Sequence, residues 1–206
     1  MQRERRLLIA TTNPHKVEEL RDLLGDIPYT LVSLANLHVA QEVEETGVTF
    51  AENAILKATE YAALTGELAL ADDSGLEIDA LGGEPGVYSA RWAGANVSYE
   101  ERFRILLARL SSVPTEQRTA RYRCVIAVAA PAPRGLLGLA EGTLEGRIAD
   151  APAGSGGFGY DPIFYVPEQA RTVGQMSLAE KQRISHRARA AARAHDLLLR
   201  LAKEDA

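Results

Sequence analysis

ALADDSGLEID, residues 69–79, ends an apolar run on two adjacent carboxylates, Asp72 and Asp73. Neighbouring carboxylates repel each other and are costly to bury without partners. A strand that runs into a solvated turn at Ser74 and Gly75 would explain the stretch taken alone, although such a turn needs only one of the two acids. Because adjacent side chains of an extended chain point to opposite sides, we expect only one of the carboxylates to face a ligand.

The sequence on both sides of this stretch alternates between strand-like and helix-like segments. Apolar runs bounded by turn residues predict the strands, and apolar residues at helical spacing behind the N-cap residues Asn13, Thr49, Ser98 and Ser177 predict the helices. The predicted strands are 5–12, 29–34, 67–71 and a hairpin of 119–130 and 136–148; the helices are 14–24, 50–64, 102–110, a short one from 178, and 186–202; the loops are 36–48, 80–94 and 154–164. This order predicts an α/β fold with a mixed sheet and helices on its faces.

The composition is that of an ordinary globular domain. The 206 residues are 46% hydrophobic and 25% charged, which suits one domain over residues 1–206. The formal net charge of −5 argues against a nucleic-acid partner, and no apolar run is long enough to span a membrane. The charged N-terminus lacks the features of a signal peptide, and Cys124, the single cysteine, lies in an apolar strand as a buried thiol would. We therefore expect a cytoplasmic protein.

Two lysines lie where a phosphorylated ligand could bind. Lys16 is expected in the first turn of a helix, where a cation opposes the positive end of the helix dipole. An anion bound between Lys16 and the helix N–H groups would explain it, and a solvated lysine is the alternative. Asn53 and Lys57 are four residues apart on the next helix and share a face, although a solvated polar stripe would look the same.

Three further stretches carry candidate ligands. One carboxylate of the acidic pair, joined by a glutamate from residues 42–45, would supply the oxygen ligands that Mg²⁺ prefers. The glycine-rich loop 154–164 permits close approach of the backbone to a ligand and offers Phe158 or Tyr160 for stacking, unless it is simply a glycine loop. Ser185 can cap the last helix, which places two potential cations, His186 and Arg187, in its first turn near Lys181. The alternative for His186 is a buried histidine whose hydrogen bonds are satisfied within the protein.

Taken together, these stretches resemble the inosine triphosphate pyrophosphatase family, which hydrolyses non-standard purine nucleoside triphosphates, and within it the bacterial XTP/dITP pyrophosphatases. The resemblance runs in order through LIATTNPHK, EETGVTFAENAILKA, LADDSGLEIDALGGEPGVYSARWAG, AGSGGFGYDPIF and EKQRISHR. These motifs extend from residue 8 to about residue 190. Each is weak or moderate alone, and the five in this order make a strong signal.

The resemblance implies two α/β lobes on a long curved mixed sheet around a central active-site cleft, and a homodimer. It implies that Asp73 is the catalytic proton acceptor and that Mg²⁺ is held by Asp73 and a glutamate of the EET segment, Glu44 or Glu45, with Glu44 favoured. One departure is Thr12, where the family commonly has glycine. The substrate-binding residues that it implies are Thr11, Thr12, Asn13, Pro14, His15, Lys16, Lys57, Ser74, Phe158, Gly159, Tyr160, Asp161, Lys181, His186 and Arg187.

The reaction so implied converts a nucleoside triphosphate and water into the monophosphate and pyrophosphate. Lys16 and Lys57 would hold the phosphates, while Asp72, on the other side of its strand, would orient neighbours such as Lys57 or backbone amides. Donors from Arg187 and the backbone of residues 158–161 would select a purine with a 6-keto group, as in ITP, dITP and XTP.

Two alternatives stay open. A Maf-type pyrophosphatase acting on pyrimidine or modified nucleotides would share the fold, but the SHR and FGYD stretches argue against it. A catalytically silent nucleotide-binding module is the other, and the presence of Asp73, Lys16 and Lys57 argues against that.

Overall fold

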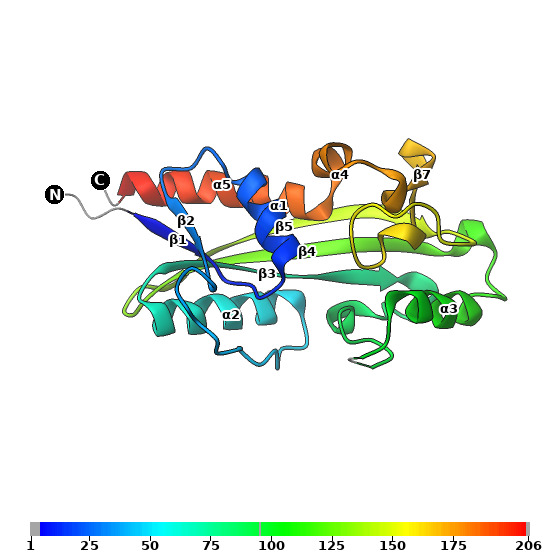
Figure 1. Cartoon of the computed structure of the whole chain (residues 1–206), viewed down its shortest axis with the longest axis horizontal. Coiled ribbons are helices and arrows are strands. Elements are labelled where there is room, and N and C mark those ends of the chain that lie inside the picture. Colours follow the sequence, from blue (N-terminus) through cyan, green and yellow to red (C-terminus); the bar gives the residue numbers. More distant parts are fainter. Residues whose placement is uncertain (1–4, 95, 205–206) are drawn as a thin grey trace. The chain divides into compact units, whose positions relative to one another are not determined.

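The computed structural model describes residues 5–94 and 96–204, so the first four residues of the charged N-terminus lie outside the described part. Within these residues seven strands are hydrogen-bonded in the order β2-β1-β3-β4-β5-β6-β7 (Figure 1). β1 (Arg6–Ile9) pairs parallel with both β2 (Thr30–Ser33) and β3 (Leu68–Ile78), whereas β6 (Phe164–Val166) pairs antiparallel with its neighbours. The predicted α/β class with a mixed sheet is confirmed.

The remaining elements follow the predicted order. The two short strands β6 and β7 were not predicted, because segments of two or three residues show no alternation. The bounds are β4 Thr119–Ala130, β5 Gly135–Ile148, β7 Arg171–Thr172, α1 Pro14–Leu23, α2 Phe50–Thr65, α3 Tyr99–Arg109, α4 Leu178–Ile184 and α5 His186–Glu204.

Side-chain caps fix where the helices begin. The Thr49 hydroxyl accepts the Glu52 N–H at the start of α2, and the Ser98 hydroxyl accepts the Glu101 N–H at the start of α3. α2 ends at Gly66, whose φ of 71° is the left-handed conformation that glycine adopts at helix C-termini. These caps were predicted from the sequence and are confirmed.

β3 differs from its prediction in length. The sequence placed a turn at Ser74 and Gly75, but the strand continues through both residues to Ile78. Its middle is buried, and the residues after the acidic pair include Leu76 and Ile78, which are fully buried. A turn at Ser74 would have left the buried backbone N–H and C=O groups of these residues without the hydrogen bonds of the sheet. The apolar residues beyond the pair therefore keep the strand extended.

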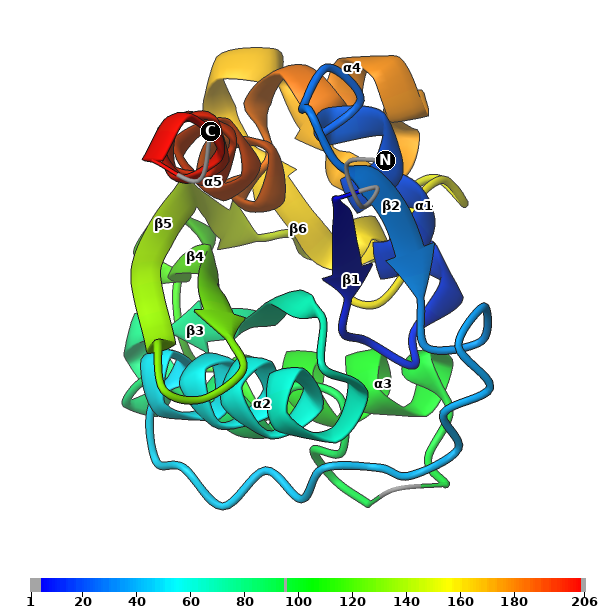
Figure 2. The same ribbon diagram turned by 90° about the vertical axis from the view of Figure 1, so that its left-hand side faces the viewer.

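The chain divides into two compact units. The first includes the chain up to Asp73, Cys124–Gly142 and the chain from Arg187. α1 and α5 pack on one face of its strands through Leu20, Leu24 and a row of α5 alanines, and α2 lies on the other side (Figure 2).

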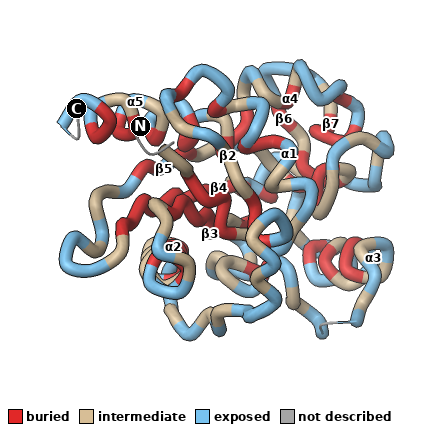
Figure 3. The backbone as a smooth tube through the Cα atoms, turned by 60° about the vertical axis from the view of Figure 1, so that its left-hand side comes forward, coloured by how far each residue is buried: buried red, intermediate tan, exposed pale blue. Residues whose placement is uncertain are grey.

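The second unit comprises Ser74–Arg123 and Thr143–His186. Its core gathers Phe103, Leu106 and Leu110 of α3 with apolar residues of the strands and of the segment 160–176. Figure 3 shows red, buried stretches along β3 and β4, and both strands continue from one unit into the other. No helix in the described ranges is long and apolar enough to cross a membrane.

Candidate functional site

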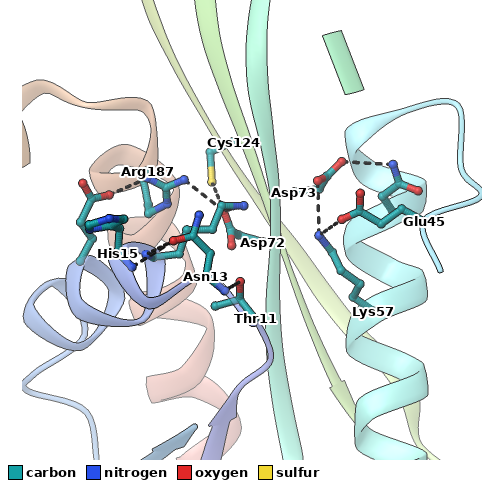
Figure 4. A network of polar contacts seen from close by, with 12 residues as sticks. Thr11, Asn13, His15, Glu45, Lys57, Asp72, Asp73, Cys124 and Arg187 are labelled. Atoms are coloured by element: carbon teal, nitrogen blue, oxygen red, sulfur yellow. Dashed lines mark hydrogen bonds and ion pairs between the residues drawn. The ribbon is translucent and has the colours of Figure 1, made fainter. Parts of the chain in front are cut away.

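Asp72 and Asp73 point to opposite sides of β3, as the alternation of an extended chain requires (Figure 4). The Asp72 Oδ2 atom lies 3.0 Å from Lys16 Nζ and 3.3 Å from an Arg187 guanidinium nitrogen. On the other side, Asp73 Oδ1 lies 3.3 Å from Lys57 Nζ. Each buried carboxylate therefore has its own cations, which answers why two adjacent acids can be buried here.

The Asp72 side is a buried ion network. Arg187 also binds the Glu19 carboxylate at 2.5 Å, and its own side chain is 2% exposed. Burial alone would raise the pKa of Asp72, but the charges of Lys16, Arg187 and Lys57 hold it well below its usual range. Burial and the nearby Asp72 raise the pKa of the Cys124 thiol to about 12, so this cysteine is the inert core thiol expected from the sequence.

Two sequence-based roles need revision on this side. Asp72 was expected to orient Lys57 or backbone amides, but its direct side-chain partners include Lys16 and Arg187. Arg187 was expected to read the base, yet its guanidinium is buried between the carboxylates of Asp72 and Glu19. Because breaking a buried ion pair leaves an uncompensated charge, the structure does not favour direct contact between Arg187 and a base.

The N-cap residue Asn13 already accepts backbone N–H groups at the start of α1. The Asn13 side chain accepts the N–H groups of His15 at 3.0 Å and Lys16 at 3.4 Å, and the Thr11 hydroxyl accepts the Asn13 N–H. A phosphate bound by those two amides would have to displace the cap. Lys16 points at Asp72, so its position beside the helix start is explained by a carboxylate of the chain itself.

The loop before α1 borders a cavity of about 510 Å³ in the first unit. Thr11, Thr12 and Pro14 line it together with residues of α1 and of the segment 33–39. The non-glycine residues that have positive φ within the described ranges are His38, Ala93 and Ala170, so Thr12 adopts an ordinary backbone conformation without glycine's freedom.

The Asp73 side joins α2, β3 and the loop before α2. Lys57 Nζ donates to Glu45 Oε1 at 2.6 Å as well as to Asp73, and Asn53 Nδ2 donates to Asp73 Oδ2 at 3.2 Å. Burial raises the pKa of Asp73 more than Lys57 and Lys16 lower it, and Glu45 and Asp72 add to the rise. Burial would lower the pKa of Lys57, but the charges of Asp73, Asp72 and Glu45 outweigh it and raise that pKa.

The geometry favours Glu45 over Glu44 as the second carboxylate. Glu45 points its carboxylate at the ammonium that Asp73 also contacts, whereas Glu44 is exposed. No group of three or more metal-binding side chains occurs in residues 5–94 and 96–204. Two carboxylates converging on one cation still fit Mg²⁺, which keeps several waters and commonly takes the remaining oxygens from substrate phosphates.

A second cluster lies in the second unit around Asp161. The Asp161 carboxylate is buried and accepts from Lys181 Nζ at 2.9 Å, from the Tyr122 hydroxyl at 3.1 Å and from the Phe158 N–H at 2.9 Å. A Cβ at Gly157 would collide with this carboxylate, so only glycine fits there. Asp161 thus organises the loop from inside, and its side chain is committed to residues of the chain.

The two aromatic residues of this loop differ. Phe158 is half-buried and carries Lys181 Nζ 4.4 Å from its ring centre. Tyr160 is buried, packs edge-on against Tyr99 and donates its hydroxyl hydrogen to the Ser89 carbonyl at 3.0 Å. Of the two side chains proposed for stacking, the structure therefore favours Phe158 and places Tyr160 in the core.

His186 and Ser74 complete the sequence-based set. The His186 ring stacks on Tyr122 at 4.7 Å between ring centres and is buried, and Ser74 is half-buried in β3. The structure thus gathers Lys16 with the acidic pair and Lys57 in the first unit, and Phe158–Asp161, Lys181 and His186 in the second.

Sequence reasoning left several members of these clusters unassigned. Glu19 and Tyr122 had no signal, because the partner of Glu19 is 168 positions away and Tyr122 lies in an ordinary apolar strand. Asn53 had a signal in its spacing from Lys57, but only the fold shows that it reaches Asp73.

A mixed α/β fold with lysines placed beside paired carboxylates is suited to phosphorylated ligands. Residues 7–197 match the model of the Ham1 family. The chain belongs to the Ham1 family.

Curated relatives match nearly the whole chain. It is 54% identical over 201 residues to a dITP/XTP pyrophosphatase of Symbiobacterium thermophilum, covering 98% of both chains. It is 46% identical over 191 residues to a dITP/XTP pyrophosphatase of Bacillus subtilis, covering 93% of this chain and 96% of that one.

Solved structures agree with the fold. The Ham1 protein of Staphylococcus aureus superposes with a TM-score of 0.83 at 42% identity, and a HAM1 protein of Coxiella burnetii with a TM-score of 0.85 at 41% identity. In both cases the match covers 94% of this chain and 98% of the other.

Proposed function

We propose that this protein is a nucleoside triphosphate pyrophosphatase that hydrolyses ITP, dITP and XTP to the monophosphate and pyrophosphate. The relatives named dITP/XTP pyrophosphatase support the substrate class. The observation that carries the reaction is Asp73, a buried carboxylate of raised pKa held between Lys57 and Asn53, with Glu45 beside it. A carboxylate whose pKa is raised by burial is a better proton acceptor than a solvated one.

In this reaction Asp73 accepts a proton from the water that attacks the α-phosphorus. A bond forms between the water oxygen and that phosphorus, the bond from phosphorus to the bridging oxygen breaks, and pyrophosphate leaves with the electron pair. Lys16 and Lys57 supply positive charge for the phosphates. Because Lys57 already holds Asp73 and Glu45, its contacts have to loosen when phosphate oxygens arrive.

Glu45 and Asp73 would hold Mg²⁺. When bound, the ion neutralises phosphate charge and lowers the pKa of a bound water. The raised pKa of Asp73 supports this assignment, since Glu45 contributes to the rise and a bound cation would relieve the repulsion between the two carboxylates.

The second cluster is the proposed base site. Phe158 offers a ring face, and Lys181 contacts both this ring and the Asp161 carboxylate. His186 stacks on Tyr122, whose hydroxyl donates to the same carboxylate. Arg187 and the Phe158 N–H already bind carboxylates of the chain. We therefore propose that the backbone N–H groups of Gly159 and Tyr160 donate to the 6-keto oxygen of the base. A site that donates to a 6-keto oxygen rejects the 6-amino group of adenine, because buried donors would then be mispaired.

We also propose a homodimer that acts in the cytoplasm and binds neither nucleic acid nor membranes. The family resemblance supports the dimer, and the net charge of −5 supports the absence of a nucleic-acid partner.

A pyrophosphate-release assay tests the proposal. Purified protein is given ITP, dITP, XTP, ATP, GTP and pyrimidine triphosphates, each with and without Mg²⁺. We expect Mg²⁺-dependent pyrophosphate release with kcat/KM highest for ITP, dITP and XTP. Preference for a pyrimidine triphosphate would favour the Maf-type alternative, and no turnover of any substrate would favour a silent binding module.

A further inference from the structure

Arg102 of α3 is a buried arginine beneath the predicted base-binding loop of the second unit. Its side chain packs with the guanidinium 4.9 Å from the centre of the Tyr99 ring. One terminal nitrogen donates to the Gly94 carbonyl at 2.9 Å. Arg102 is 2% exposed, so these contacts are made away from solvent.

Tyr99 connects this arginine to the loop, because its ring contacts both the Arg102 guanidinium and the Tyr160 ring. Tyr160 is the third residue of Phe158–Asp161, its hydroxyl donates to the Ser89 carbonyl at 3.0 Å, and its ring packs edge-on against Tyr99 at 5.3 Å between ring centres. The neighbouring Gly159 has a φ of 67° and lies close enough to Tyr99 that an added Cβ would be 3.7 Å from its hydroxyl. The position of the two backbone N–H groups proposed for the base therefore depends on Tyr99 and Arg102.

The positive charge of Arg102 does not stabilise the fold through an ion pair. Within residues 5–94 and 96–204 its guanidinium forms no ion pair with a carboxylate, and its Nε atom has no hydrogen-bond partner. A buried cation without a counter-ion, and a buried donor without an acceptor, both cost stability. An apolar side chain of similar length would fill the same space without that cost.

We propose that Arg102 is a positioning residue for nucleobase recognition: by holding the Tyr99 ring it fixes Tyr160, and thereby the backbone of residues 158–161, in the conformation that receives the base. This inference rests on the proposed function of the loop. It assigns no contact between Arg102 and the substrate.

The first test separates base binding from phosphate chemistry. Arg102→Met keeps much of the stem and removes every donor, and Arg104→Met on the same helix is the matched control, since Arg104 is exposed and pairs with Glu101. For Arg102→Met we expect the KM for ITP to rise about tenfold, with kcat changed by less than about threefold. Inhibition by inorganic tripolyphosphate, which has no base, should stay at the wild-type level in both variants.

The second test does not need turnover. Amide hydrogen exchange of residues 157–161 should accelerate in Arg102→Met, while exchange in α1 and β1 of the first unit stays as in the wild type. Arg102→Lys, which keeps the charge and some donor capacity, should restore part of both the KM and the protection, and it replaces Arg102→Met if that variant does not fold.

A double-mutant cycle identifies the route. If Arg102 acts through the Tyr99 ring, Tyr99→Leu and Arg102→Met should be clearly less than additive in their effects on KM. Unchanged KM and unchanged exchange in Arg102→Met would overturn the proposal, and so would faster exchange with an unchanged KM. If the wild type does not hydrolyse ITP, the proposed function fails, and exchange at 157–161 alone then decides whether Arg102 positions the loop.

Discussion

Asp72 and Asp73 are neighbours in β3, yet each pairs with a different lysine: Asp72 with Lys16 at 3.0 Å and Asp73 with Lys57 at 3.3 Å. The pKa of Asp72 is depressed because its cations outweigh its burial, whereas the pKa of Asp73 is raised because burial prevails. One carboxylate is therefore stabilised as a permanent charge, and the other is left able to take a proton. This division of roles leads to the predictions below.

Asp73→Asn should abolish turnover without unfolding the protein. The variant loses the proton acceptor, so kcat for ITP should fall by about 10² to 10⁴. Because the raised pKa of Asp73 means that its charged form is disfavoured in the fold, the melting temperature should be unchanged or slightly higher. Asp196→Asn is the control, since that side chain is 74% exposed. A kcat near the wild-type value at saturating Mg²⁺ would remove Asp73 from catalysis.

Glu45 and Glu44 form a matched pair for the second carboxylate. Glu45→Gln should raise the Mg²⁺ concentration needed for half-maximal activity by about tenfold or more, because one of two anionic ligands is lost. Glu44→Gln, at an exposed neighbouring position, should behave like the wild type. Titration of Mg²⁺ at fixed ITP measures both variants, and the reverse ranking would restore the preference for Glu44 drawn from the sequence.

Asp72→Asn should destabilise the fold in a pH-dependent manner. At neutral pH it leaves the buried Arg187 and Lys16 short of a counter-charge, which typically costs about 3–5 kcal/mol of unfolding free energy. Since the folded pKa of Asp72 is depressed, its contribution is fully present above the unfolded-state pKa of about 3.9 and is lost as the pH falls below it.

Urea unfolding of wild type and Asp72→Asn between pH 3 and 8 measures this directly. The difference in unfolding free energy should be constant above about pH 5 and shrink toward acid. A difference that grows on acidification would mean that Asp72 is not held as the anion.

Lys16→Ala should weaken substrate binding and also lower stability. Helix-dipole reasoning alone predicts a slight gain in stability when a cation leaves the first turn. The structure reverses that expectation, because Lys16 is an ion-pair partner of a buried carboxylate. We expect a loss of about 1–2 kcal/mol, moderated by the remaining Arg187, together with a higher KM for ITP. A flat KM and an unchanged melting temperature would contradict both the binding role and the stabilising role of Lys16.

The sequence predicts the fold well where local rules decide. Asn13, Thr49 and Ser98 cap helices because their side chains act within a few residues, and the alternation of Asp72 and Asp73 follows from strand geometry. The sequence predicts poorly those side-chain roles that depend on residues far away along the chain. Arg187 looks like a ligand-binding cation until Glu19 and Asp72 are brought to it, and the Ser74–Gly75 turn is overridden by the buried residues that follow.

The most direct test of the central claim is hydrolysis of ITP in ¹⁸O-labelled water with Mg²⁺, followed by mass spectrometry of the products. Attack of water on the α-phosphorus predicts IMP and pyrophosphate, with one ¹⁸O atom in IMP and none in pyrophosphate. Label in pyrophosphate, or release of IDP and orthophosphate, would contradict the reaction that the Asp73 side of β3 is proposed to carry out.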